Sequence, residues 1–429
     1  MTPRHDGTAR ACTFAPTASG GHARYVWELL NALAREDHRG WRHELVTSED
    51  LDPELRCDLY AVHPILPPLQ HRSSFPHRLA WVASRLAHYL RRERAFLQWL
   101  ASRPDIDLVH LQEWTPWLAP SLVRRIRAMG KRVVFTVHNI VPHKYPRYVP
   151  RTMVNHWIRN ACRRCDGLFV HSAALAEQLS RRLGAGHPPI HVTPHGVWTL
   201  APAAGAPAAT ASTGSTAGEA PPPRSLAERL RTKRLLFFGS IRRNKGLDLL
   251  LRAAASLPDY SITIAGEPLD AAYHENEVLP LVRELQRAGR QIDLRDRFIP
   301  EQDLPALFAA HSAILLPYTS GFVAQSGVVF MALAHELPVI STEAGGLAEL
   351  MRDFPIGRTF RPATAEALAK AVRQLHEEVD PEALLREIRA ARNKYSWSSA
   401  ASATLLGYRA AMEPVRESHD CEVGTTPAC

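Results

Sequence analysis

The residues with the clearest chemical potential form a short basic segment, Phe237–Gly246 (FFGSIRRNKG). An apolar run ends at Gly239, and Arg242 and Lys245 follow before a helical pattern begins. The N-terminus of a helix with cations beside it attracts anions. Arginine offers two parallel hydrogen bonds and lysine a compact charge, and both suit a diphosphate. The segment therefore predicts a phosphate-binding loop, with a solvated basic loop as the alternative.

A second segment of this kind is Tyr318–Val329 (YTSGFVAQSGVV). Ser326 and Gly327 stand where a helix is expected to begin. The first backbone N–H groups of a helix have no intrahelical partner, and glycine permits close approach of a ligand. We therefore predict a second phosphate contact here, with an ordinary capped helix as the alternative.

Two loops in the first half could also contact a ligand. Gly20 and Gly21 follow an apolar run and would let the backbone approach a bound molecule before the next helix. The pattern is not G-x-G-x-x-G, so the dinucleotide fingerprint is absent. His138 and Asn139 end another apolar run, and a neutral imidazole there can hydrogen-bond a sugar hydroxyl or a developing charge. A structural histidine is the alternative reading of His138.

Both halves of the chain alternate short apolar runs with helical patterns. Strands that are apolar along their whole length are buried on both faces, which indicates parallel sheets. The alternation predicts doubly wound α/β domains. The expected strands are 11–15, 43–46, 59–62, 108–112, 133–137, 168–171 and 190–193 in the first half, and 234–240, 261–265, 313–316 and 338–341 in the second.

One stretch interrupts this alternation. Residues 201–223 consist of Ala, Pro, Gly, Ser and Thr with a single acid, a composition that cannot bury a core. Ligands of open α/β sheets bind beyond the carboxyl ends of the strands, so two such domains should face a cleft. The predicted division is an N-terminal domain over 1–198, a linker over 199–226, a C-terminal domain over 227–396, a helix over 397–415 and a tail over 416–429.

The net charge of +9 over 429 residues is unevenly distributed. Residues 1–200 hold 27 Lys and Arg against 16 Asp and Glu, whereas the rest hold 25 against 27. A basic half suits nucleic acid, anionic lipid or a phosphorylated substrate. No nucleic-acid motif accompanies the charge, so we expect no nucleic-acid partner. No uncharged run of 18 apolar residues occurs and no apolar segment follows the first residues, so the cytoplasm is the expected compartment.

A basic, aromatic helical stretch covers residues 78–100. It is compatible with a peripheral contact at an anionic inner membrane face. A helix packed on the N-terminal sheet with an exposed basic face is the alternative. Its relevant side chains are Trp81, Arg85, Tyr89, Arg91, Arg92, Arg94, Phe96 and Trp99.

Several other chemistries are disfavoured. Cys162 and Cys165 form a lone C-x-x-C without a second pair or a histidine at metal-ligand spacing, so no metal site is predicted. The chain shows no Ser-His-Asp ordering, H-E-x-x-H motif or P-loop, which argues against a hydrolase, a zinc protease and an ATPase.

Taken together, these segments resemble the family-4 glycosyltransferases of GT-B fold, from about residue 11 to residue 412. The resemblance implies two Rossmann-like domains facing a central cleft. It also implies a retaining, metal-independent hexosyltransferase of polysaccharide biosynthesis. The nucleotide-sugar is then a co-substrate, no cofactor is needed, and the acceptor is a saccharide, a lipid-linked molecule or a small molecule. The segments that carry it are Gly20–Gly21, Thr136–Asn139, Gly196–Val197, Phe238–Arg242, Lys245–Gly246, Arg297–Pro300, Ser326–Val328, Leu337–Val339 and Gly345–Gly346.

The resemblance also implies roles for individual residues. His138 is the candidate catalytic residue, and the leaving diphosphate itself can take the proton of the acceptor. The last helix would cross back onto the N-terminal domain. The implied contacts are Arg242, Lys245, Ser326, Gly327 and Val328 for the diphosphate, Gly239, Arg297, Phe298, Ile299 and Gln325 for the base and sugar, and Gly20, Gly21 and Asn139 on the acceptor side.

The chain departs from the family pattern at two glutamates that usually lie eight residues apart. Aligned on Leu337–Val339, those positions hold Val323 and Met331, and the other register gives Ser320 and Val328. Gln325 offers a neutral substitute contact. The departure leaves two alternatives open: a catalytically degenerate GT-B scaffold that binds a nucleotide or a protein partner, and another GT-B activity such as a sugar-nucleotide epimerase.

Overall fold

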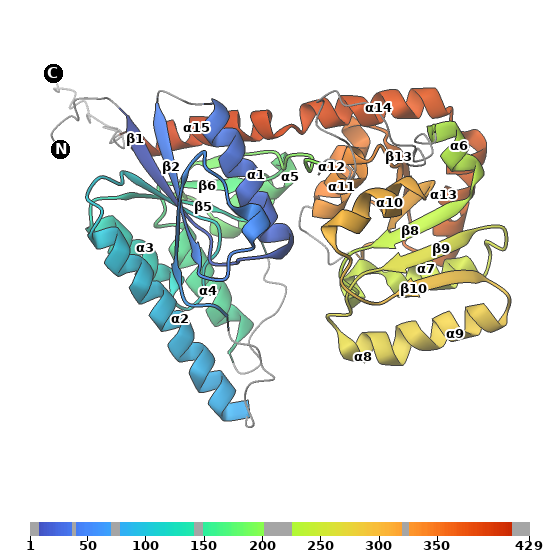
Figure 1. Cartoon of the computed structure of the whole chain (residues 1–429), viewed down its shortest axis with the longest axis horizontal. Coiled ribbons are helices and arrows are strands. Elements are labelled where there is room, and N and C mark those ends of the chain that lie inside the picture. The colour runs from blue at the N-terminus through green and yellow to red at the C-terminus, as the bar shows by residue number, and fades with distance from the viewer. Residues whose placement is uncertain are drawn as a thin grey trace, which may run out of the picture.

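The structure, a computed structural model, describes residues 8–36, 40–69, 78–140, 149–200, 225–319 and 326–413. These residues form two α/β domains that lie side by side, with a long C-terminal helix running from one to the other (Figure 1). Residues 201–224 of the expected linker (199–226), Gln325 and the expected tail (416–429) lie outside the described residues.

The N-terminal domain is built on a seven-stranded parallel sheet in the order β3-β2-β1-β4-β5-β6-β7. Its central strands are largely buried on both faces, and β4 is buried at every residue. Helices α2 to α5 pack on one face, and α1 and the last helix, α15, pack on the other. The elements are β1 (Ala9–Phe14), α1 (Gly20–Glu36), β2 (Trp41–Ser48), η1 (Pro53–Leu55), β3 (Ala61–Leu66), α2 (Arg78–Ala101), β4 (Leu108–Leu111), α3 (Ala119–Ala128), β5 (Arg132–Thr136), α4 (Arg151–Cys162), β6 (Gly167–Val170), α5 (Ala173–Leu183) and β7 (Ile190–Val192).

The C-terminal domain has a six-stranded parallel sheet in the order β10-β9-β8-β11-β12-β13. Its strands and helices share one large apolar core. The elements are α6 (Leu226–Arg231), β8 (Arg234–Phe238), η3 (Arg243–Lys245), α7 (Leu247–Ala254), β9 (Ser261–Ala265), α8 (Ala271–Tyr273), η4 (His274–Val278), α9 (Leu279–Arg287), β10 (Gln291–Arg295), η5 (Glu301–Asp303), α10 (Leu304–Ala309), β11 (Ala313–Leu316), α11 (Gly327–Ala334), β12 (Val339–Thr342), α12 (Gly345–Asp353), β13 (Gly357–Phe360), α13 (Ala365–Glu378) and α14 (Pro381–Lys394).

Both sheets follow the doubly wound order expected from the sequence, and each reverses its winding at one point. The reversal lies between β1 and β4 in the first sheet and between β8 and β11 in the second. Ligands of such sheets bind outside the carboxyl ends of the strands at this switch point. The loops after these four strands are therefore the places where a functional site is expected.

The last helix, α15 (Trp397–Met412), leaves the C-terminal domain and lies on the N-terminal sheet (Figure 1). Its Tyr408 hydroxyl lies 2.7 Å from Nδ1 of His110 on β4. Gly407 fits closely, because a Cβ atom built there would lie 2.3 Å from the ring of Phe169 on β6. The crossing helix therefore ties the two domains together.

Glu44 on β2 is a buried carboxylate at the edge of the N-terminal domain. Its Oε1 lies 2.6 Å from Nη2 of Arg103, and its Oε2 lies 2.8 Å from Nε2 of His63. Burial raises the pKa of Glu44, but the hydrogen bonds from His63 and Arg103 outweigh burial and lower that pKa to about 2. The carboxylate is thus ionised throughout the neutral range.

We expect this cluster to make the stability of the domain depend on pH in acid. Because the pKa of Glu44 is lower in the folded chain than its usual value of about 4.5, the stabilisation is present above that pH and is lost as the pH falls towards about 2. Arg103→Ala should lower the free energy of unfolding near pH 7 by about 1 kcal/mol, since the partners are partly exposed and screened. Urea unfolding near pH 7 and near pH 3 checks this; the same loss at both pH values contradicts it.

Candidate active site

The basic loop after β8 is held in place by two glycines. Gly239 has a φ of +109°, and Gly246 is left-handed with φ +66° and ψ +31°. A Cβ atom at Gly246 would lie 1.9 Å from the carbonyl oxygen of Pro317, which follows β11. The two loops are also joined by a hydrogen bond from the Thr319 amide to the carbonyl oxygen of Asn244 (3.2 Å). Only glycine allows this packing, which brings the loops after β8 and β11 together at the switch point.

Lys245 and the start of α11 converge through Tyr318. Nζ of Lys245 lies 3.9 Å from the centre of the Tyr318 ring, and the Tyr318 hydroxyl lies 2.8 Å from Oγ of Ser326. The Ser326 side chain therefore bonds Tyr318 and does not cap α11. The amides of Gly327 and Val328, in the first turn, have no partner within the helix. A cation and two amide donors are thus assembled at one place.

The three cations of the basic loop have different surroundings. Arg243 forms a bidentate ion pair with the carboxylate of Glu277 and stacks over Tyr273, so it holds the loop to α8 and η4. Arg242 is half-buried, and its Nε is buried without a hydrogen-bond partner in the part of the chain that the structure describes. Arg242 is therefore the arginine of the pair with hydrogen-bonding capacity left for a ligand.

The segment expected to contact the base, Arg297–Ile299, follows β10. The Phe298 side chain is 69% exposed, and Ile299 is buried in the core. Gln325 and two of the positions aligned with the family glutamates, Ser320 and Val323, lie outside the described residues. The other two, Val328 and Met331, are half-buried on α11, so no carboxylate stands there.

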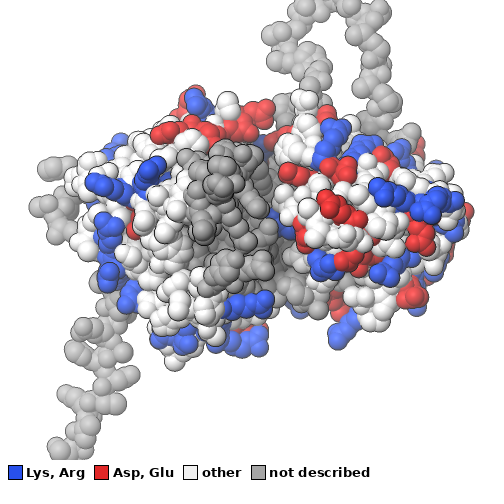
Figure 2. All heavy atoms as spheres, turned by 90° about the horizontal axis from the view of Figure 1, so that it is seen from below, with Lys and Arg blue, Asp and Glu red and all other residues white. Residues whose placement is uncertain are grey.

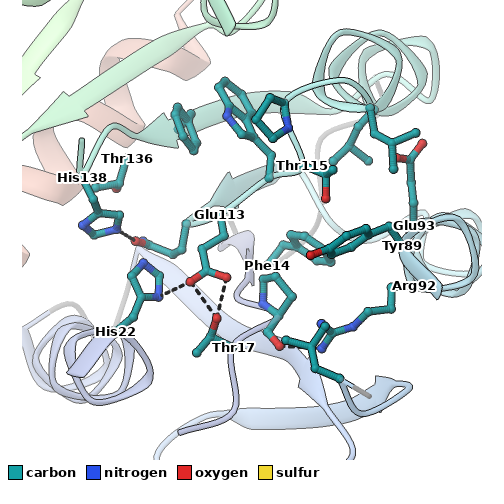
Figure 3. A pocket seen from close by; sticks show the side chains of 18 of the residues that line it. Phe14, Thr17, His22, Tyr89, Arg92, Glu93, Glu113, Thr115, Thr136 and His138 are labelled. Carbon is teal, nitrogen blue, oxygen red and sulfur yellow. Dashed lines mark hydrogen bonds and ion pairs between the residues drawn. The ribbon is translucent and has the colours of Figure 1, made fainter. Parts of the chain in front are cut away.

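The N-terminal domain contributes a cavity of about 460 Å³ at its own switch point (Figure 3). It is formed by the loops after β1, β4 and β5 together with α2. His138 and Asn139 line it, whereas Gly20 and Gly21 lie at the exposed start of α1 beside it. Its other lining residues are Phe14, Pro16, Thr17, His22, Leu69, Tyr89, Arg92, Glu93, Gln112, Glu113, Trp114, Thr115, Pro116, Leu118, Leu122, Phe135 and Thr136.

His138 is hydrogen-bonded at both ring nitrogens. Its Nε2 lies 3.0 Å from Oε1 of Gln112, and its Nδ1 lies 3.0 Å from Nε2 of His171. Burial, reinforced by the neighbouring histidines, lowers the pKa of His138 well below its usual value. The ring is therefore neutral at physiological pH and acts through hydrogen bonds.

His22 and Glu113 form a second polar group in the cavity. Neither residue was predicted from the sequence as a site residue. Nδ1 of His22 lies 2.9 Å from Oε1 of Glu113, and the Thr17 hydroxyl lies 2.8 and 2.7 Å from the two carboxylate oxygens (Figure 3). Burial raises the pKa of Glu113, but His22, Thr17 and Arg92 together lower it below the usual value. The carboxylate is therefore ionised. The available signal was position: Glu113 lies in the loop directly after β4, and His22 lies in the first turn of α1, the helix that follows β1.

Contacts between the domains connect the N-terminal cavity to the start of α11 in the C-terminal domain. Nε1 of Trp198 donates to the carbonyl oxygen of Gly327 (2.8 Å), and the His195 ring stacks on Phe330 of α11 at 4.4 Å. His195 in turn lies 5.8 Å from His171, the partner of His138. A chain of contacts across the domain boundary thus links the start of α11 to the residues beside the N-terminal cavity. Within the described ranges, no group of three or more His, Cys, Asp or Glu is arranged to hold a metal ion.

This fold is that of the GT-B class of glycosyltransferases. The structure superposes on sucrose-phosphate synthase from Thermosynechococcus elongatus with a TM-score of 0.68 at 18% identity, covering 94% of this chain and 98% of that one. It superposes on the catalytic domain of starch synthase IV from Arabidopsis thaliana, bound to ADP and acarbose, with a TM-score of 0.65 at 15% identity, covering 95% and 100%.

The sequence identifies the family. The model of Glycosyltransferase Family 4 matches residues 19–199, and that of Glycosyl transferases group 1 matches residues 232–378. Glycogen synthase of Mycobacterium tuberculosis is 25% identical over 444 residues, covering 94% of each chain. The chain belongs to glycosyltransferase family 4 and is a glycosyltransferase that uses a nucleotide-sugar.

Proposed function

We propose that the protein transfers a hexosyl group from a nucleoside-diphosphate sugar to a hydroxyl of its acceptor, with retention of the anomeric configuration and without a metal. The observation that carries this proposal is the convergence of Lys245, Tyr318 and Ser326 at the switch point of the C-terminal sheet. When the sugar leaves, negative charge develops on the diphosphate. A fixed cation and helix amides stabilise that charge, which is the part a metal ion plays in other transferases.

The other donor contacts are proposed from where Arg242 and Phe298 lie, in the loops after β8 and β10. Arg242 has an unpartnered buried Nε and would add a second cation at the diphosphate. The exposed Phe298 ring beyond β10 offers an apolar surface to the nucleobase, beside the backbone of Arg297 and Ile299. ADP binding by the similar starch synthase supports a purine nucleotide as one candidate.

On the acceptor side, the N-terminal cavity is within the size range of small-molecule sites. Asn139, Gln112 and His138 present hydrogen-bonding groups, and Trp114 stacks flat on Phe135 with ring centres 3.5 Å apart. Polar groups beside aromatic rings suit a hydroxyl-rich acceptor, so a saccharide is favoured over an apolar molecule. A sugar-bearing lipid would place its polar end here.

The test is a donor and acceptor screen with the purified full chain. Thermal shift with UDP-glucose, ADP-glucose, GDP-mannose and dTDP-glucose selects the donor, since a ligand at about 100 times its Kd stabilises by about 2.7 kcal/mol. Transfer is then measured with maltotetraose, D-inositol 3-phosphate and a glycolipid, with and without EDTA. Proton NMR of the product reads the anomeric configuration. Inversion, or loss of activity in EDTA, would contradict the corresponding part of the proposal.

A catalytically degenerate scaffold is the competing proposal. It is favoured by one observation, the aliphatic side chains of Val328 and Met331 where the family has a glutamate. Nucleotide binding without transfer or donor hydrolysis in the same screen would support it. Epimerisation of the donor in the absence of acceptor would instead support the epimerase alternative.

Peripheral contact with an anionic membrane, at the cytoplasmic face, is a further proposal. The outer face of α2 exposes Leu86 (46%) and Leu90 (47%) beside Arg91 and Arg94. Phe96 was expected among the membrane-facing aromatic residues, but its ring is buried in the core. Figure 2 shows Lys and Arg on this domain as separate spots among uncharged atoms. No helix in the described ranges is long and apolar enough to cross a membrane.

We expect the protein to co-sediment with vesicles of phosphatidylcholine and phosphatidylglycerol but not with phosphatidylcholine alone. The arginines would be attracted by anionic lipid, and the exposed leucines would add apolar contact. The double variant Leu86→Ser/Leu90→Ser should bind less, and added salt should release the wild type. Sedimentation that does not depend on anionic lipid would contradict this contact.

A further inference from the structure

A buried arginine on α2 lines the cavity of the N-terminal domain. Arg92 was expected among the basic residues of a membrane-facing helix, but only 5% of it is exposed and it lines the cavity. Figure 3 shows Arg92 beside Tyr89 on one side of the cavity, with His22 and His138 on the other. His138 is the residue that His171 links to the domain boundary. Arg92 therefore lies at the end of the cavity away from the C-terminal domain.

The guanidinium of Arg92 uses few of its hydrogen-bond donors. Nη2 donates to the carbonyl oxygen of Pro16 (2.5 Å), and this is its one hydrogen bond to a residue that the structure describes. Nε is buried and has no partner among the same residues. An arginine side chain carries five N–H donors, and a buried donor without a partner is costly. The remaining donors of Arg92 are therefore available to a ligand in the cavity.

The positive charge of Arg92 is also unpaired within the described ranges. Two carboxylates line the cavity, but neither forms an ion pair with it. Glu113 is held by the contacts described above, and Oε1 of Glu93 faces Nη1 of Arg125 at 3.7 Å. Burial lowers the pKa of Arg92, and the more distant carboxylates of Asp50 and Glu113 offset this only in part. A buried charge without a paired counter-charge is costly, which indicates that an anion belongs beside it.

We propose that Arg92 binds an anionic group of the acceptor, a carboxylate or a phosphate, at this end of the cavity. The proposal rests on the proposed function and names its acceptor class: an acidic saccharide, either a uronic acid or a sugar phosphate. Guanidinium N–H groups match both anions with parallel hydrogen bonds. The ionised Glu113, near the centre of Figure 3, repels an anion placed beside it, so the negative group fits only at the Arg92 end. The hydroxyl that receives the sugar then lies towards His138 and the domain boundary.

Binding of three matched sugars to the full chain tests this subsite. Glucose, glucuronic acid and glucose 6-phosphate differ only in the group at C6, which is neutral, a carboxylate or a phosphate. Calorimetry is carried out with UDP or ADP bound, so that the proposed diphosphate site is already filled. We expect at least one of the two acidic sugars to bind about tenfold or more tightly than glucose, since hydrogen bonds between charged groups are stronger than neutral ones. That sugar identifies the anion.

Arg92→Met should remove this preference and leave glucose binding unchanged, because it keeps an unbranched apolar side chain and loses the charge. Arg92→Lys keeps the charge without the planar fork and should retain part of the preference. Arg124→Met, at an exposed arginine on α3, is the matched control and should bind all three sugars as the wild type does. The same selectivity should appear in kcat/KM for transfer to the acidic and neutral sugars.

Equal binding of the three sugars by the wild type would overturn the proposal, and this comparison decides even if Arg92→Met fails to fold. Equal weakening of all three sugars in Arg92→Met would also overturn it, since Arg92 would then only hold the loop of Pro16 in place. Wild-type selectivity in Arg92→Met would overturn it as well. Preferred binding of an acidic sugar without any transfer would instead contradict the proposed function and leave the Arg92 site standing.

Discussion

Gly246→Ala is expected to abolish detectable glycosyl transfer and to destabilise the C-terminal domain. The left-handed backbone alone costs a residue with a Cβ atom about 1–2 kcal/mol. The new Cβ would also lie 1.9 Å from the carbonyl oxygen of Pro317, a backbone atom that cannot rotate away. The loops after β8 and β11 would have to separate, carrying Lys245 away from Tyr318 and Ser326. Transfer assays and thermal unfolding of the variant measure the two effects.

Gly289→Ala separates the cost of the left-handed backbone from the cost of the clash with Pro317. Gly289 has a similar φ of +76°, but nothing lies within 4 Å of a Cβ built there. This control should lose about 1 kcal/mol of stability and keep wild-type transfer. A Gly246→Ala enzyme as active as Gly289→Ala would mean that the packing of the two loops is irrelevant to the reaction.

Lys245→Ala is expected to lower kcat/KM for the nucleotide-sugar by about 10- to 150-fold. One charge-assisted hydrogen bond contributes about 1.5–3 kcal/mol, and each 1.4 kcal/mol is a factor of ten in rate. The fall should appear largely in kcat, because the charge on the diphosphate grows as the sugar leaves. Steady-state kinetics over a range of donor concentrations separates kcat from KM.

Two further variants serve as controls for this measurement. Lys370→Ala, an exposed lysine on α13 of the same domain, should leave the kinetics unchanged. Lys245→Arg keeps the charge and should retain more activity than the alanine variant. Sugar transfer by Lys245→Ala at the wild-type rate would remove the proposed diphosphate site.

The fold was predictable where strands are apolar on both faces. Central strands such as β4 and β11 are buried at every residue and stand out as continuous apolar runs. The two edge strands of the second sheet, β10 (QIDLR) and β13 (GRTF), were missed because they are partly exposed and contain no continuous apolar run. β3, one of the two edge strands of the first sheet, is also partly exposed; it was placed at 59–62 and lies at 61–66.

The site was predictable where glycine and charge occur within one loop. Gly239, Arg242, Lys245 and Gly246 marked the loop after β8 as the candidate donor loop from their types alone. The sequence could not tell Arg242 from Arg243, because the difference depends on Glu277 of a later helix. The pairing of His22 with Glu113 was equally hidden, since it depends on β1 and β4 being neighbours in the sheet.

A crystal structure of the protein with UDP or ADP, whichever stabilises it more, tests the central claim most directly. We predict the diphosphate in the crevice between the domains, within hydrogen-bond distance of Lys245 Nζ and of the amides of Gly327 and Val328. A nucleotide bound elsewhere, with Lys245 and the start of α11 making no contact to its phosphates, would contradict the account.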